Sequence, residues 1–199
     1  TLLAELRRRL SQRFDDLPAG LPAEEFARVA APTGSAAFNI RFRATTIHRL
    51  IHWLRLSHFA EVKRDAELDR LQQHLQHLQL LVLDEISMVG RQMMGRVDSR
   101  LRQAKVARNC EARSLGGVSC VGVGDPAQCE AIMDQQIYDL APHKRTTDGG
   151  DAPAVRLSNV GLEVYASFDE VVVLTTCHRL VKIDEPTTDA ERAFNERAE

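Results

Sequence analysis

Hydrophobic residues recur at helical spacing in four parts of the chain. Leu2 to Phe14 carries an apolar residue every fourth position, which predicts an amphipathic helix over residues 1 to 14. The same periodicity returns from Ile47 to Leu54, from Leu68 to Leu78 and from Val89 to Leu101. We therefore expect four helices.

Short, fully apolar runs separate these segments and predict buried strands. They are Phe26 to Ala31, Leu80 to Leu83, Val118 to Val123 and Val171 to Leu174. Strands of this kind, alternating with helices, are typical of a parallel sheet covered on both faces. The predicted fold class is therefore α/β with a mainly parallel sheet. Polar residues follow several of the strands, at the edge where open α/β sheets place their ligand site.

Other stretches predict loops and boundaries. Residues 142 to 159 are rich in Pro, Gly, Asp and Thr and predict an exposed loop. The chain begins with Thr1 inside a helical pattern, and residues 189 to 199 are helix-like without a stop signal. We expect both ends to be cuts, and residues 1 to 199 to form a single partial domain.

Net charge, the length of apolar runs and cysteine spacing exclude several classes of protein. The 26 Lys and Arg residues against 28 Asp and Glu residues give a net charge of −2, which excludes nucleic-acid binding by overall charge, so any DNA contact is local. No apolar run approaches the roughly 20 residues that span a bilayer, and the first residues do not form a signal peptide. We expect a nuclear or intracellular protein without membrane contact. The four cysteines lack CxxC spacing, which predicts reduced thiols.

Two acids at the exit of one predicted strand carry the sharpest chemical signal. Asp84 and Glu85 directly follow Leu80 to Leu83. A carboxylate at such a place holds Mg²⁺, and a second one beside it orients or deprotonates an attacking water. Taken alone, the pair fits a strand-to-helix cap as well as an ATPase site.

Further motifs favour the ATPase site. Asp84-Glu85-Ile86-Ser87-Met88 resembles motif II of the Pif-one family of superfamily-one DNA helicases, which includes the helicases of Helitron transposons. The segment from Ala31 to Ile40, APTGSAAFNI, followed by Thr46-Ile47-His48, resembles motif Ia and the element after it. Gly124-Asp125-Pro126-Ala127-Gln128 is similar to motif III, and the segment from Val173 to Arg179, VLTTCHR, is similar to motif IV.

The resemblance implies a RecA-like P-loop NTPase domain, the first motor domain of an ATP-dependent helicase that moves 5′ to 3′ on single-stranded DNA. It implies that Asp84 holds Mg²⁺ and Glu85 activates water, while Gln128 senses the γ-phosphate and Arg179 acts as an arginine finger. ATP is the expected substrate, single-stranded DNA the expected partner and a monomer the expected state. DNA repair, recombination, telomere maintenance and transposition are the roles that the family suggests.

The family's path for single-stranded DNA implies a second set of residues. Backbone groups hold phosphates along it and an aromatic ring stacks on a base. The matching residues here are Thr33, Gly34, Phe38, Asn39 and His48. From the sequence, Phe38 fits a stacking residue and a core residue equally well.

The sequence also departs from the family. No G-x-x-x-x-G-K-[ST] loop occurs, and Thr1 corresponds to a position at or just after that loop, where it would touch the nucleotide. We therefore expect the sheet to lack its phosphate-loop strand, Val118 to Val123 to lie beside Leu80 to Leu83, and Val171 to Leu174 to be poorly anchored.

Two alternatives stay open. We expect the chain alone to be inactive in ATP hydrolysis, since the phosphate loop is absent. Cys129-Glu130-Ala131 also replaces the usual Leu-Pro-Pro after Gln128, and Leu180 replaces the usual Gln after Arg179. A catalytically inactive helicase remnant that acts as a binding module is therefore one alternative, and a non-helicase P-loop ATPase is the other.

Overall fold

A computed structural model describes residues 22–40, 43–53, 59, 62, 66–106, 112–141, 153–175 and 188. The chain divides into two units, Thr1–Ser167 and Phe168–Glu199. The predicted helix over residues 1 to 14, Thr1 and Arg179 all lie outside the described residues. Among the described residues, Cys120 and Cys129 are free thiols, whereas Cys110 and Cys177 lie outside that part of the chain.

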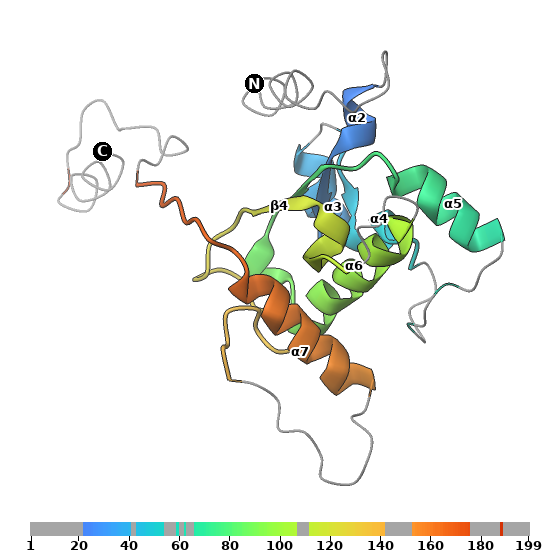
Figure 1. The fold of residues 1–199 in the computed structure, drawn as a ribbon. Helices are drawn as coiled ribbons and strands as arrows, with labels where there is room; N and C mark the ends of the chain where they lie inside the picture. Colours follow the sequence, from blue (N-terminus) through green and yellow to red (C-terminus); the bar gives the residue numbers. More distant parts are fainter. Residues whose placement is uncertain are drawn as a thin grey trace, which may run out of the picture. The chain divides into compact units, whose positions relative to one another are not determined.

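A four-stranded parallel sheet forms the centre of the first unit (Figure 1). Its strands are β1 (Ala27–Ala31), β2 (Thr45–Thr46), β3 (Leu80–Leu83) and β4 (Ser119–Gly122), in the order β2-β1-β3-β4. Each adjacent pair is parallel, which confirms the predicted α/β class. The two central strands are almost wholly buried, whereas β4 is mostly exposed. The predicted pairing of Val118 to Val123 with Leu80 to Leu83 is confirmed in the register of β3 and β4.

Helices connect and cover these strands. They are α2 (Ala23–Phe26), α3 (Gly34–Ile40), α4 (Ile47–Leu50), α5 (Ala66–Leu75), η1 (Ile86–Met88), α6 (Arg91–Ala104), η3 (Ser114–Gly117) and α7 (Pro153–Ala166). The helices predicted over Leu68 to Leu78 and Val89 to Leu101 are confirmed as α5 and α6. The helix predicted over Ile47 to Leu54 ends early, because His52 adopts a left-handed φ of 53° that an α-helix does not tolerate.

Helix α7 packs closely against α6 (Figure 1). Two glycines make this possible. A Cβ added at Gly95 would overlap the backbone carbonyl oxygen of Leu157, and one added at Gly161 would overlap that of Arg91. The two helices therefore meet through their backbones, and Met94, Val97 and Leu101 of α6 are fully buried.

Two predictions about secondary structure were wrong. Residues 153 to 159, predicted as loop, begin α7, because a proline is tolerated in the first turn of a helix and the buried face of α7 starts at Ser158. Residues 142 to 152 lie outside the described part. Val171 to Leu174, predicted as a strand, forms none, and its side chains are 76% to 87% exposed. In the described part of the chain, no helix is long and apolar enough to cross a membrane.

Candidate functional site

The two acids lie at the carboxyl end of β3, as predicted. The amide of Asp84 donates to the carbonyl oxygen of Ala30 at 2.9 Å, which ties the exits of β3 and β1 together. Glu85 takes left-handed backbone angles, φ 51° and ψ 49°, which are uncommon for a residue with a Cβ and cluster at functional sites. Both residues are half-buried, so their carboxylates are at the rim of the sheet and not in the core.

The strand-to-helix cap is the alternative reading of these acids. Glu85 is at the cap position of η1, and its side chain makes no capping hydrogen bond there. The α6 helix begins after Gly90 and is capped by a different acid, Asp134. The capping interpretation therefore does not account for Glu85.

The segment after β4 lies directly beside the segment after β3. The amide of Val123 donates to the oxygen of Leu83 at 2.8 Å, and the amide of Ile86 donates to the oxygen of Val123 at 2.9 Å. A Cβ at Gly124 would be 2.8 Å from the nitrogen of Ile86, so the close approach requires a glycine. The Gly124-Asp125 pair therefore lies against Glu85-Ile86.

Gln128 lies in an exposed turn that follows Gly124-Asp125. Its amide donates to the oxygen of Asp125 at 3.1 Å, and the amide of Ala127 donates to the Asp125 carboxylate at 2.9 Å. The turn thus starts at the same edge of the sheet as Asp84 and Glu85.

The other end of this loop is fastened to the N-terminus of α6. The Asp134 carboxylate accepts hydrogen bonds from the amides of Gln92 at 3.2 Å and Met93 at 3.1 Å. The amide of Arg91 donates to the oxygen of Gln135 at 2.9 Å. The loop that carries Gln128 is therefore held both at β4 and at the helix that follows Asp84 and Glu85. Sequence patterns missed Asp134 because its partners lie about forty residues earlier.

Arg91 is a second residue that the sequence did not reveal. Its side chain is fully buried and donates to four oxygen atoms. These are the backbone oxygens of Ser158 at 3.3 Å, Asp139 at 3.2 Å and Ala141 at 2.7 Å, and Oδ1 of Asn159 at 3.4 Å. A buried guanidinium with several acceptors fixes the segments that supply them. Arg91 thus fastens α7 and the end of the Gln128 loop to α6.

Thr33, Gly34, Phe38 and Asn39 lie at and just after the exit of β1. The Thr33 hydroxyl accepts from the amide of Ala36 at 3.2 Å, which caps α3. Gly34 and Asn39 are exposed, and the Phe38 side chain is 81% exposed. The interpretation of Phe38 as a core residue is therefore wrong, whereas its stacking on a base stays a prediction.

His48 lies in α4 and connects it to α6. Its ring stacks on Trp53 with centroids 5.0 Å apart, and the Arg96 guanidinium is 4.5 Å from the Trp53 centroid. Burial, and then the Arg96 charge, lower the pKa of His48 below its usual value. At neutral pH His48 is therefore uncharged. No local sequence pattern indicates this stack of rings and guanidinium.

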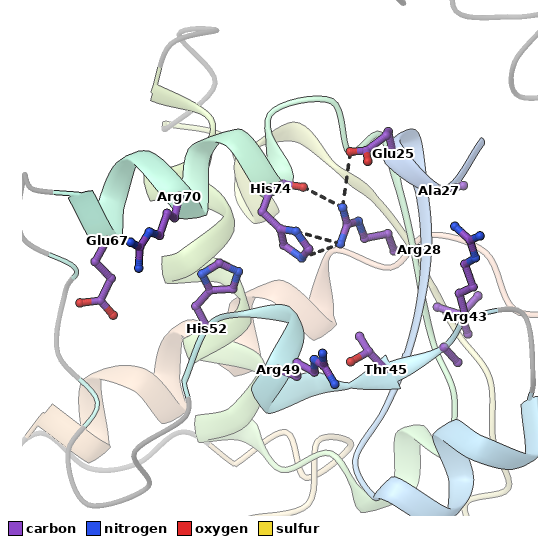
Figure 2. Close-up of a pocket in the computed structure, with 12 residues that line it drawn as sticks. Glu25, Ala27, Arg28, Arg43, Thr45, Arg49, His52, Glu67, Arg70 and His74 are labelled. Carbon is purple, nitrogen blue, oxygen red and sulfur yellow. Dashed lines mark hydrogen bonds and ion pairs between the residues drawn. The ribbon is translucent and has the colours of Figure 1, made fainter. Parts of the chain in front are cut away.

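A cavity of about 920 Å³ lies at a different place, between β1, β2, α4 and α5 (Figure 2). None of the catalytic or DNA-path residues predicted above lines it. We call it the basic cavity; the charged and histidine side chains around it are Glu25, Arg28, Arg43, Arg49, His52, Glu67, Arg70 and His74.

Comparisons with known proteins give one family and several structures. The AAA domain family matches residues 18–160. Among curated proteins nothing matches. Among solved structures, the chain is similar to Bacteroides Pif1 bound to ssDNA, with 25% identity over 66% of this chain and 27% of that chain and a TM-score of 0.44. It is similar to Pif1 helicase from Candida albicans, with 23% identity over 65% of this chain and 27% of that one and a TM-score of 0.42. The chain thus spans about 27% of the length of these two helicases.

Proposed function

The chain belongs to the AAA domain family, and from this membership we propose that it is the ATP-hydrolysing motor domain of a DNA helicase that translocates 5′ to 3′ on single-stranded DNA. One observation carries the proposal. The exits of β1, β3 and β4 are hydrogen-bonded to one another, and the motif Ia, II and III segments follow those three exits. The motifs therefore share the edge where parallel α/β sheets bind ligands.

In the proposed site the general base, the γ-phosphate sensor and the arginine finger are three different residues. Glu85 has no capping role, and its left-handed backbone holds its carboxylate at the rim; it serves as the general base for the attacking water. Gln128 lies on a loop that is held by hydrogen bonds at both ends, and it senses the γ-phosphate of the bound nucleotide. Arg179, which follows Val171 to Leu174 in the sequence, supplies the arginine finger, and Thr1 touches the nucleotide.

Mg²⁺ fits the residues at this edge. No group of three or more His, Cys, Asp or Glu side chains able to hold a metal occurs among the residues that the structure describes. Mg²⁺ characteristically uses one or two carboxylates and takes its remaining ligands from phosphates and water, so the half-exposed Asp84 suffices as the protein ligand. When bound, the ion neutralises charge on the transferred phosphate.

The test measures ATP hydrolysis by the full-length product of the gene, with and without single-stranded DNA. We expect the DNA to stimulate hydrolysis. Glu85→Gln should lower the stimulated rate by about 10²- to 10⁴-fold, the usual contribution of a general base, and leave binding of Mg-ATP unchanged. Glu163→Gln, which removes an exposed carboxylate on α7, is the matched control and should be neutral.

The same measurement separates the alternatives. Hydrolysis that single-stranded DNA does not stimulate would indicate a P-loop ATPase that is not a helicase. DNA binding without hydrolysis would indicate a binding module, for which Cys129-Glu130 after Gln128 is the motivating feature. Either result contradicts the proposed helicase.

A further inference from the structure

The basic cavity forms where the sheet is incomplete. Strand β2 pairs only with Ala30 and Ala31, so the first half of β1 has no strand on that side among the described residues. The cavity lies along this open edge, and α4 and α5 supply its other walls (Figure 2). A short β2 thus leaves room for a ligand beside β1.

The charge of the cavity is opposite to that of the whole chain. Four arginines and two glutamates line it, an excess of two positive charges in a chain whose net charge is −2. Glu25 contacts Arg28 at 3.6 Å, an ion pair that Figure 2 draws. A concave surface with positive charge concentrates anions.

Arg28 is held in a fixed orientation. Its Nη1 donates to Nε2 of His74 at 2.5 Å, and its Nη2 donates to the backbone oxygen of His74 at 2.9 Å. Burial, followed by the charge of Arg28, lowers the pKa of His74 to about 4, so the imidazole is neutral at physiological pH. His74 therefore orients the guanidinium and adds no charge of its own. A pre-oriented guanidinium loses less entropy when it binds an oxyanion.

Arg49 and Arg70 supply two further positive charges, on side chains that can move to contact a ligand. Both side chains are exposed, and within the described part of the chain neither guanidinium has a hydrogen-bond or ion-pair partner. In Figure 2 they approach the cavity from α4 and α5, respectively. Guanidinium groups match the geometry of phosphate oxygens and bind them in a bidentate manner.

The rest of the lining favours phosphate over a base or an apolar ligand. The apolar wall consists of the small side chains of Ala27, Val29 and Ala44, and no Phe, Tyr or Trp is among the described lining residues. A base needs an aromatic platform, which Phe38 offers elsewhere. We propose that the basic cavity binds backbone phosphates of a nucleic acid strand, as a contact separate from the path over Thr33 and Phe38. The choice of a nucleic acid rests on the proposed function.

The experiment compares two double variants that each remove two positive charges. Arg49→Gln with Arg70→Gln changes the cavity, and Arg113→Gln with Arg156→Gln changes exposed arginines outside the cavity lining. Binding of a labelled single-stranded oligonucleotide is followed by fluorescence anisotropy over a range of salt concentrations. Circular dichroism checks that both variants are folded.

We expect the cavity variant to bind about tenfold more weakly at low salt than the control variant. Its log–log salt slope should fall by roughly 1.4, the value for two lost phosphate contacts on a single strand. Equal affinities and slopes for the two double variants would overturn the proposal. If Phe38→Ala still weakens binding in that case, the proposed function survives while the cavity is excluded as a contact.

A chain that does not bind the oligonucleotide at all would instead contradict the proposed function. The cavity is then tested with inorganic pyrophosphate, by following the arginine side-chain resonances in NMR spectra. Shifts at Arg28, Arg49 and Arg70 that disappear in the cavity variant would support a phosphate site for a small ligand. No shift at these residues would overturn the site.

Discussion

The backbone of Gly161 lies directly against the carbonyl oxygen of Arg91, with no space between them for a side chain. The contact is matched by Gly95 against the carbonyl of Leu157, so α6 and α7 interlock through two glycines. The side chain of Arg91 continues this junction, because it donates to the backbone oxygen of Ser158. Helix α6, which follows Asp84 and Glu85 in the chain, is thus held in place by its contact with α7.

Gly161→Ala should therefore destabilise the protein. A Cβ inserted into this contact forces the helices apart, which costs about 1 to 3 kcal/mol, and the better helix propensity of alanine offsets at most about 1 kcal/mol. Urea denaturation measures the free energy of unfolding. Gly34→Ala is the control, because nothing lies within 4 Å of its added Cβ. A Gly161→Ala protein as stable as the Gly34→Ala protein would contradict the close contact.

Asp134→Ala should remove the cap of α6. Loss of a side-chain cap on the amides of Gln92 and Met93 costs about 0.5 to 2 kcal/mol. Asp134→Asn keeps one of the two acceptor oxygens and loses the charge at the helix N-terminus, a charge worth about 0.3 to 1 kcal/mol. The expected order of thermal stability is wild type, then asparagine, then alanine. If the alanine variant has the same melting temperature as the wild-type protein, Asp134 does not cap α6.

Much of the fold follows from local pattern. Strand β3 was predictable from its continuous apolar run and helix α6 from its hydrophobic period, and the edge with Asp84 and Glu85 followed from the parallel sheet. Helix α7 was not predictable, because Pro153 and the glycines read as loop signals and the reason for Gly161 is a contact with α6. Asp134, as the cap of a helix far from it in sequence, left no local signal.

The basic cavity was hidden from the sequence for a related reason. Arg28 and His74 are 46 residues apart, and neither stands in a motif. Their pairing depends on β1 and α5 lying side by side, which periodicity does not specify. In the structure His74 orients an arginine, a role that the spacing of the histidines along the chain does not indicate.

Phe38→Ala should separate DNA binding from stability. The side chain is 81% exposed, so its removal should leave the melting temperature unchanged. If Phe38 stacks on a base, its loss should weaken oligonucleotide binding by about 1 to 3 kcal/mol. Ile132→Ala removes a side chain of similar exposure, 80%, and should leave binding unchanged. Equal binding by the two variants would exclude Phe38 from the DNA path.

The lowered pKa of His74 predicts that the folded protein loses stability as the pH falls. Burial is the largest cause, followed by the charges of Arg28, His52 and Arg49. The unfolded chain takes up a proton near the ordinary value of 6.5, whereas the folded chain takes it up only near 4. Between these values the unfolded state binds more protons, so stability is complete above about 6.5 and falls as the pH drops towards 4.

His74→Gln tests this relation, since glutamine keeps an acceptor for Arg28 and does not titrate. The variant should lose less stability than wild type as the pH falls from neutrality towards 4, with a slope smaller by up to one proton. His48 and His52, whose pKa values burial also lowers, contribute to the slope that remains. The unfolding free energy is measured by urea denaturation at several pH values. Parallel curves for the two proteins would mean that His74 takes up its proton equally in the folded and unfolded states, and that Arg28 and burial do not hold it neutral.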